Sequence, residues 1–201
     1  MLEKIYYKKN TDDILNKLKG RKEEINTDVN LAVEEILKDI KENGNKALIK
    51  YAEKFDGFKI KSMDDIIVSE DEIEAGASRV GENFIRILNR AKKQIIEFHK
   101  NQIGNSWSIY KENGVIMGQI VRPLERVAIY VPGGTAAYPS TVLMNVIPAQ
   151  IAGVKEIVMI TPVKSDGKVA DAILAAAKVC GIKTILKIGG AQTIRSSSLW
   201  D

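Results

Sequence analysis

Two glycine pairs in the second half of the chain are the residues with the clearest chemical potential. The first pair lies in Pro132-Gly133-Gly134 and follows Tyr130, and the second opens Gly189-Gly190-Ala191-Gln192. Because glycine has no Cβ, a ligand can approach the backbone N–H groups of such a turn closely. The Tyr130 phenol can stack or hydrogen-bond, and the Gln192 carboxamide can donate and accept. Together these residues predict one wall of a nucleotide site.

Each of these features also has a plainer interpretation. A tyrosine near a strand end is commonly half-buried for packing reasons alone, and paired glycines also suit a tight turn. The order Pro132-Gly133-Gly134-Thr135 differs from the Gly-x-Gly-x-x-Gly dinucleotide fingerprint, so it does not by itself identify NAD as the ligand. Ser140 and Thr141 follow shortly afterwards, and they suit a helix N-cap better than a catalytic role.

The remaining reactive side chains do not form a catalytic or metal-binding set. His99 is the only histidine and Cys180 the only cysteine, whereas a zinc site takes three or four ligands. The other residues give neither a paired-carboxylate nor a Ser-His-Asp arrangement. We therefore expect no catalytic residue and no metal ligand. We expect Cys180, on an apolar helical stretch, to be a buried structural thiol.

The elements that carry the two glycine turns alternate between strand and helix. The pattern predicts strands over 126–131, 156–161 and 184–188, a helix from Ser140 or Thr141 to Ala152, and a helix over 168–180. Short connections and apolar strands favour a parallel sheet, and open α/β sheets bind ligands at the carboxyl ends of their strands. We expect the two turns to follow neighbouring strands. We also expect Pro148 to kink the first of these helices.

The first 121 residues are predicted to be mainly helical. Their periodicity and stop signals predict helices over 27–42 and 46–55, a short strand over 66–68, a long helix capped by Ser69 and bent near Gly81, and a hairpin that turns at Asn113-Gly114. The expected fold class is α/β, with a helical N-terminal region before an incomplete Rossmann-like βαβαβ parallel-sheet domain. We place the domains at residues 1–121, which include the hairpin, and 122–201.

Composition restricts the class of protein. The chain has 201 residues, with 30 Lys and Arg against 26 Asp and Glu, and a net charge of +4. A nucleic-acid surface needs a basic stripe, but here the two signs alternate, so we expect no nucleic-acid partner. We expect no membrane association, because no stretch approaches the ~20 apolar residues of a membrane span. We expect a cytoplasmic protein, since the first ten residues do not resemble a secretory signal.

Several stretches carry a resemblance to a known family. In the second half they are Arg122-Pro123-Leu124-Glu125-Arg126, Tyr130-Val131-Pro132-Gly133-Gly134, Pro139-Ser140-Thr141-Val142-Leu143-Met144, Pro148-Ala149-Gln150-Ile151-Ala152-Gly153-Val154 and Gly189-Gly190-Ala191-Gln192. In the first half they are Gly44-Asn45-Lys46-Ala47-Leu48, Phe55-Asp56-Gly57 and Ile96-Glu97-Phe98-His99. Through these stretches, most of the chain resembles the histidinol dehydrogenase family.

The resemblance implies an activity, its cofactors and two site residues. It implies a zinc enzyme of histidine biosynthesis that oxidises L-histidinol to L-histidine through L-histidinal in two NAD-dependent hydride transfers. It also implies a homodimer with shared active sites. In that family, the tyrosine before Val-Pro-Gly-Gly and the glutamine of Gly-Gly-Ala-Gln contact NAD. The matching residues in this sequence are Tyr130 and Gln192.

The sequence departs from the family pattern after Gln192. It reads Thr193-Ile194-Arg195-Ser196-Ser197-Ser198-Leu199-Trp200-Asp201, where the family continues with an Ala-rich helix and further chain. We therefore expect a truncated copy that lacks the family's zinc ligands and the Glu-His pair for proton transfer, and that does not catalyse the reaction by itself. The alternative function is an inactive remnant that acts at most as a nucleotide-binding or dimerisation module.

Overall fold

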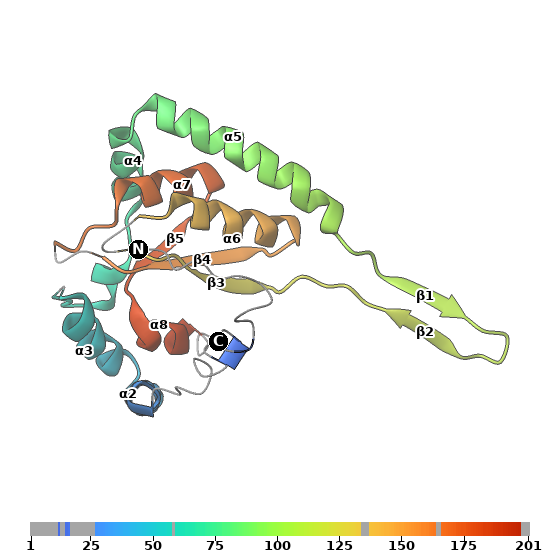
Figure 1. Ribbon diagram of the computed structural model, residues 1–201, viewed down its shortest axis with the longest axis horizontal. Coiled ribbons are helices and arrows are strands. Elements are labelled where there is room, and N and C mark those ends of the chain that lie inside the picture. The colour runs from blue at the N-terminus through green and yellow to red at the C-terminus, as the bar shows by residue number, and fades with distance from the viewer. Residues whose placement is uncertain are drawn as a thin grey trace.

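A computed structural model gives the structure of the chain, and it describes residues 12, 15, 16, 27–57, 59–133, 137–163 and 166–197. Figure 1 shows a small sheet between two groups of helices, with a long hairpin that projects from them. The helices are α2 (Thr27–Asn43), α3 (Asn45–Asp56), α4 (Glu70–Arg79), α5 (Glu82–His99), α6 (Pro139–Ile151), α7 (Asp171–Cys180) and α8 (Gly190–Ser197), with short 3-10 helices η1 (Met63–Ile66) and η2 (Lys100–Gln102).

The central sheet has three parallel strands in the order β3-β4-β5. They are β3 (Arg126–Tyr130), β4 (Glu156–Thr161) and β5 (Thr184–Lys187). The register places Tyr130 opposite Ile160, and Thr161 opposite Lys187. The predicted parallel βαβαβ unit and the α/β class are therefore confirmed, with strand and helix ends that differ from the prediction by a few residues.

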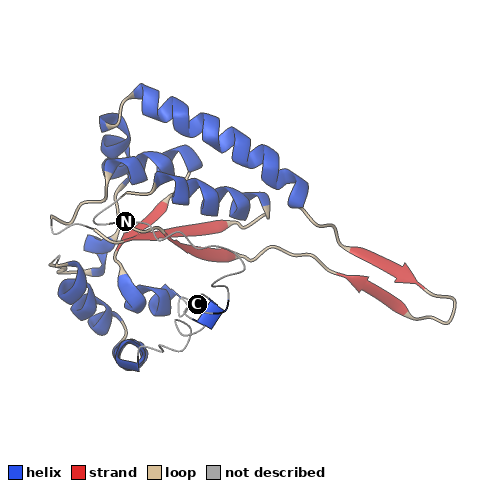
Figure 2. Ribbon diagram, viewed as in Figure 1, coloured by secondary structure: helices blue, strands red, loops and turns tan. Residues whose placement is uncertain are grey.

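Helices cover both faces of this sheet, as Figure 2 shows. Alternate strand residues point to opposite faces. Ile129, Met159 and Ile185 belong to the core cluster formed with α4, α5, α6 and α7. Val158, Ile160, Leu186 and Ile188 belong to a second cluster, formed with α2 and α3. Helix α8 lies on the same side as α2 and α3, and it contacts both of them.

The second face is only partly covered. The cluster on the α2 and α3 side takes residues from β4 and β5, and none of its described members comes from β3. On β3, Arg126, Ala128 and Tyr130 are exposed, whereas Ile129 is buried against the other face. The side of β3 nearest to α8 is therefore open.

The helical structure is interrupted at Gly81. We predicted one long helix, bent near this residue, and that prediction is wrong. Two separate helices, α4 and α5, flank Val80 and Gly81. Gly81 has a φ of 79°, a left-handed value that no helix interior tolerates and that glycine adopts easily. The predicted cap is confirmed, because the Ser69 hydroxyl accepts a hydrogen bond from the Glu72 N–H at 3.1 Å.

The predicted strand over 66–68 is also wrong. Residues Met63–Ile66 form the 3-10 helix η1, whose N-terminal end is capped by the Asp65 carboxylate, which accepts the Ser62 N–H at 3.1 Å. The segment after it pairs with the sheet through one antiparallel bridge from Ile67 to Leu186 and through the Val68 N–H, which donates to the Ile185 carbonyl at 2.9 Å. The apolar run is too short to pair further, and Val68 is buried in the core.

Helix α6 begins one residue earlier than predicted. Pro139 occupies its first position and Tyr138 is the N-cap, with no side-chain cap bond. Ser140 and Thr141 lie inside the first turn, so the N-cap role predicted for them is wrong. Proline suits that first position because its missing N–H has no partner there in any helix. Helix α6 continues past Pro148 to Ile151.

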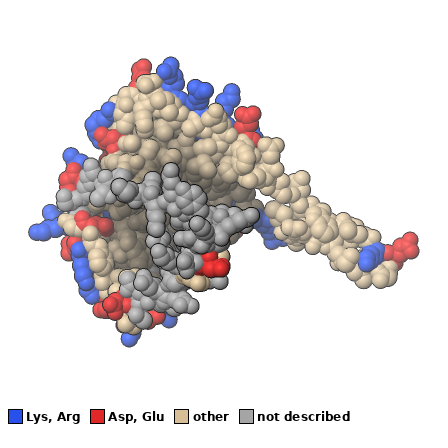
Figure 3. Space-filling view, in the orientation of Figure 1, with Lys and Arg blue, Asp and Glu red and all other residues tan. Residues whose placement is uncertain are grey.

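The predicted hairpin is confirmed. Strands β1 (Trp107–Tyr110) and β2 (Ile116–Gln119) pair antiparallel, with Trp107 opposite Gln119. The turn includes Gly114, which has a φ of 82°, as an Asn-Gly hairpin requires. Every residue of both strands is exposed. In Figure 3 the surface of this arm is largely uncharged except at its tip.

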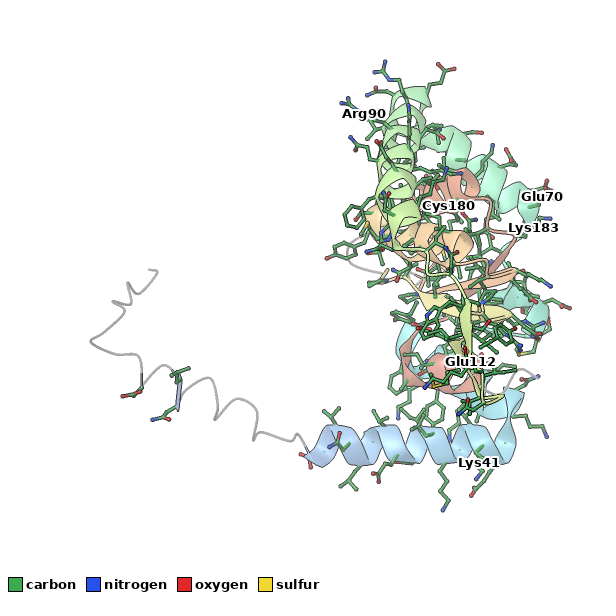
Figure 4. All side chains as sticks on the ribbon, turned by 90° about the vertical axis from the view of Figure 1, so that its right-hand side faces the viewer. Lys41, Glu70, Arg90, Glu112, Cys180 and Lys183 are labelled. Carbon is green, nitrogen blue, oxygen red and sulfur yellow. The ribbon has the colours of Figure 1, made fainter. Side chains whose placement is uncertain are left out.

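Charged side chains are distributed over the surface. Figure 4 shows Lys41, Arg90 and Glu70 on separate outer helices and Cys180 within the helical layer. Cys180 is 2% exposed, which confirms the predicted buried thiol. Of the helices that the structure describes, none has the length and apolar character needed to cross a bilayer.

The contact between α4 and α7 predicts an effect for Gly76→Ala. A Cβ on Gly76 would lie 2.5 Å from Leu174 Cδ1 and 2.9 Å from Leu174 Cβ. Such overpacking costs about 1–3 kcal/mol, which exceeds the ~1 kcal/mol that alanine adds to a helix. We expect a lower Tm by circular dichroism. Gly104→Ala is the control, because its nearest neighbour would be Val121 Cγ2 at 3.7 Å. Equal Tm values for both variants would contradict the close α4–α7 contact.

The environment of Cys180 predicts a slow reaction with thiol reagents. Burial raises the pKa of the thiol to about 11, with a smaller opposing effect from Lys92. Only the thiolate reacts, so at neutral pH the folded chain should react with Ellman's reagent far more slowly than the chain in guanidinium chloride. Equal rates in the two conditions would show that Cys180 is accessible.

Candidate functional site

The candidate site lies at the edge of the sheet where the three parallel strands end. Val131 follows β3, and its N–H donates to the Ile160 carbonyl at 2.8 Å, which extends the pairing by one residue. Pro162 follows β4, and Ile188 and Gly189 follow β5. Because parallel strands have their carboxyl ends at one edge, the predicted turns at Gly133 and Gly189 lie on the same edge.

The two glycine turns do not follow neighbouring strands, so that prediction is wrong. They follow β3 and β5, and β4 lies between them. The reason is that the strand order along the sheet equals the order along the chain, so the second of the three strands must separate the first from the third. At about 4.8 Å between strands, the two turns begin roughly 10 Å apart.

Thr161 and Pro162 fill the space between the turns. A Cβ on Gly133 would lie 2.8 Å from the Pro162 carbonyl oxygen and 2.9 Å from Thr161 Oγ1. A Cβ on Gly189 would lie 2.7 Å from Pro162 Cβ. Both glycines are therefore required by close packing against the same segment. Sequence reasoning missed Thr161 and Pro162, although a Thr-Pro pair directly after an apolar strand was a usable signal.

Tyr130 lies on the open side of β3. It shares a face of the sheet with Ile160, its partner in the register, and this is the face on which α8 lies. Its side chain is partly accessible, at 37% of the residue surface. The phenol is thus available to a ligand placed along the strand edge, next to the Pro132-Gly133 turn.

Gln192 lies in the first turn of α8 and is fully buried, at 0% exposure. Its carboxamide folds back onto Gly190, where a Cβ would collide with Gln192 Oε1. Gly190 also has a φ of 76°, so both conformation and space favour glycine there. Among the described residues, neither Oε1 nor Nε2 of Gln192 has a hydrogen-bond partner, and the same holds for the buried Oγ1 of Thr161.

An unpartnered buried carboxamide is unusual, because leaving such a group unsatisfied costs about 1–3 kcal/mol. A ligand that donates to Oε1 and accepts from Nε2 would remove this cost. The nicotinamide amide and the ribose hydroxyls of a dinucleotide have the required donors and acceptors. The carboxamide and the hydroxyl are therefore the two groups at this edge whose hydrogen bonding a polar ligand would complete.

A carboxylate from the helical region holds the second turn. The Gly189 N–H donates to Asp56 Oδ2 at 3.1 Å, and the Thr193 hydroxyl donates to the Gly189 carbonyl at 2.6 Å. Burial raises the pKa of Asp56, and the hydrogen bond from Gly189 lowers it in part. On the opposite face, Lys187 at the end of β5 is paired with Glu72 at 3.1 Å.

The described residues give no ligand set that fits zinc. Among them, no group of three or more His, Cys, Asp or Glu side chains is arranged to hold a metal ion. His99 lies away from the strand edge. Its Nδ1 is 2.6 Å from Gln102 Oε1. With Arg122 and Pro148 it lines a cavity of about 530 Å³ at the base of the hairpin.

Comparisons with known proteins agree with one another. The family model for histidinol dehydrogenase matches residues 19–198. The histidinol dehydrogenase of Lactococcus lactis subsp. lactis (strain IL1403) is 59% identical over 194 residues, and that of Clostridium acetobutylicum is 49% identical over 177 residues. The crystal structure of histidinol dehydrogenase from Elizabethkingia anophelis superimposes with a TM-score of 0.76 at 40% identity.

These matches cover most of this chain but less than half of each relative. The alignment spans 96% of this chain and 45% of the Lactococcus protein, and 88% of this chain and 40% of the Clostridium protein. The Elizabethkingia structure matches 84% of this chain and 38% of its own. The chain therefore corresponds to an N-terminal portion of the full-length relatives.

The unpartnered carboxamide predicts that Gln192→Met stabilises the ligand-free chain. The substitution keeps the side-chain length and removes two buried polar atoms that have no partner, so we expect a gain of about 1–3 kcal/mol in the free energy of unfolding. Urea denaturation measures it. The matched control is Gln150→Met, because the Gln150 Nε2 donates to the Cys180 carbonyl at 2.7 Å and its loss should destabilise. A destabilised Gln192→Met chain would mean that the carboxamide is satisfied without ligand.

Proposed function

The chain belongs to the histidinol dehydrogenase family, and we propose that it supplies the NAD-binding part of an enzyme that oxidises L-histidinol to L-histidine. The observation that carries the proposal is the buried carboxamide of Gln192, which has no partner among the described residues. It lies at the same strand edge as the exposed phenol of Tyr130. A dinucleotide along that edge would cover the second group, and it would satisfy the first once the Gln192 side chain turns toward it.

In this proposal the residues of the chain bind and orient the cofactor. Gln192 hydrogen-bonds the amide or a ribose hydroxyl of the ligand, and Tyr130 stacks on it or donates from its hydroxyl. Gly133 allows the close packing on Thr161 and Pro162 that forms the turn beside the ligand. Bound NAD would accept a hydride in each of the two oxidations that pass through L-histidinal.

The remaining features of the proposal come from the family. A zinc ion is the second cofactor of the family, and we assign no residue of this chain to it. Residues 122–201 would form the NAD-binding half-domain and residues 1–121 the helical region with the hairpin. We also propose a homodimer for the full-length form, a cytoplasmic location, and L-histidinol as the small-molecule substrate.

A second candidate function is narrower: the chain binds a nucleotide, or pairs with another subunit, without turning over substrate. Two points favour it. The carboxamide and the phenol can be explained by ligand binding without any reaction. The chain also aligns with only 45% of the Lactococcus relative. The two candidates share the NAD site and differ in hydride transfer.

NAD binding is tested by isothermal titration of the purified chain. We expect saturable binding that Gln192→Ala weakens about tenfold, the effect of losing about 1.4 kcal/mol of hydrogen bonding. Tyr130→Ala should also weaken it. The matched controls are Gln119→Ala and Tyr110→Ala, which change exposed residues of the hairpin and should leave the affinity unchanged.

The outcome of this titration separates the candidates. A chain that shows no saturable NAD binding would refute both nucleotide-binding proposals. In the full-length form, binding followed by NADH formation when L-histidinol and zinc are added would support the dehydrogenase. Binding without NADH formation in that form would support the second candidate.

A further inference from the structure

The turn that carries Gln192 is held by a residue from a distant part of the chain. Asp56 is the last residue of α3, and its Oδ2 accepts the Gly189 N–H across a separation of 133 residues. Its Oδ1 would be 3.1 Å from a Cβ at Gly189. Gly57 ends α3 directly after it, with a φ of 66° and an N–H bond to the Glu53 carbonyl. The carboxylate is therefore fixed at the end of a helix.

The backbone at Gly189 and Gly190 determines where the Gln192 carboxamide lies. The peptide groups on both sides of Gly189 are held, the N–H by Asp56 and the carbonyl by the Thr193 hydroxyl at 2.6 Å. The carboxamide then packs on Gly190 so closely that no Cβ fits. A shift of this turn would therefore move the carboxamide with it.

The carboxylate is suited to this position by its charge. Gly189 directly precedes α8, so Asp56 lies at the positive end of the helix dipole, where a negative charge is favourable. Burial nevertheless raises the pKa of Asp56, which indicates that its desolvation is only partly compensated. Asp56 thus combines a favourable position at the start of a helix with a cost of desolvation.

We propose that Asp56 is a positioning residue for dinucleotide binding: its carboxylate fixes the backbone at Gly189 and so holds the Gln192 carboxamide where the ligand meets it. This inference rests on the proposed NAD site and extends it into the helical region. It means that α3, which packs against α8, supplies part of the cofactor site without touching the cofactor.

The first test is NAD affinity in three variants. Asp56→Ala should weaken binding about tenfold, since it removes a charged acceptor from the turn. Asp56→Asn keeps an oxygen acceptor in the same place and should recover most of the affinity. Asp65→Ala is the matched control: the Asp65 carboxylate also accepts backbone N–H groups, from Lys61 and Ser62 at 2.8 and 3.1 Å, but at η1. It should bind NAD as the wild type does.

The second test asks whether Asp56 acts through Gln192. Once Gln192 is alanine, the carboxamide that Asp56 positions is gone, so adding Asp56→Ala should change the affinity by less than about twofold. Additive losses in the double variant would overturn the inference, because they would mean that Asp56 affects binding by another route.

Amide hydrogen exchange of the ligand-free chain gives a readout that does not depend on NAD. Peptides over residues 186–193 should exchange faster in Asp56→Ala than in the wild type, whereas peptides from α6 should be unchanged. Unchanged exchange over 186–193 would overturn the inference, and faster exchange everywhere would show that Asp56→Ala affects the whole fold.

The outcomes distinguish this inference from the proposed function. If the wild type binds NAD and Gln192→Ala weakens it, while Asp56→Ala binds normally, the positioning role alone is wrong. If the wild type binds no NAD, the proposed function is wrong and the role of Asp56 in dinucleotide binding is lost with it. In that case faster exchange in Asp56→Ala would still show that the carboxylate holds the turn.

Discussion

Close packing at the ends of three parallel strands is the constraint on which the rest of the structure depends. Pro162, after the central strand, contacts the turn at Gly133 on one side and the turn at Gly189 on the other, and neither position has room for a Cβ. The strand order places these turns two strands apart. Their shared contact with one segment nevertheless makes them a single edge.

The two layers of helices contribute differently to that edge. Helices α4, α5, α6 and α7 bury the larger core cluster and support the sheet from one side. On the other side α2 and α3 cover β4 and β5 only, so the face of β3 that carries Tyr130 stays open. The helical region therefore supports the sheet, leaves its edge accessible, and through Asp56 holds the turn of α8 in place.

Polar groups at this edge are arranged at the expense of stability. The Gln192 carboxamide and the Thr161 hydroxyl are buried without partners among the described residues, and burial raises the pKa of Asp56. Elsewhere among the described residues a comparable group is satisfied, because the Gln150 carboxamide donates to the Cys180 carbonyl. These unsatisfied groups lie at the strand edge for which we propose a ligand, and a bound ligand would complete them.

The sequence by itself determined what depends on near neighbours: the alternation of strands and helices, the Asn113-Gly114 hairpin, the Ser69 cap and the family. It also placed Tyr130 at the end of an apolar strand and Gln192 in the glycine-bearing segment after the last strand. Only the tertiary structure decided that β4 separates the two turns, that the carboxamide is buried, and that Asp56 meets Gly189. Those features arise from contacts between residues far apart in the chain, and no local periodicity records such contacts.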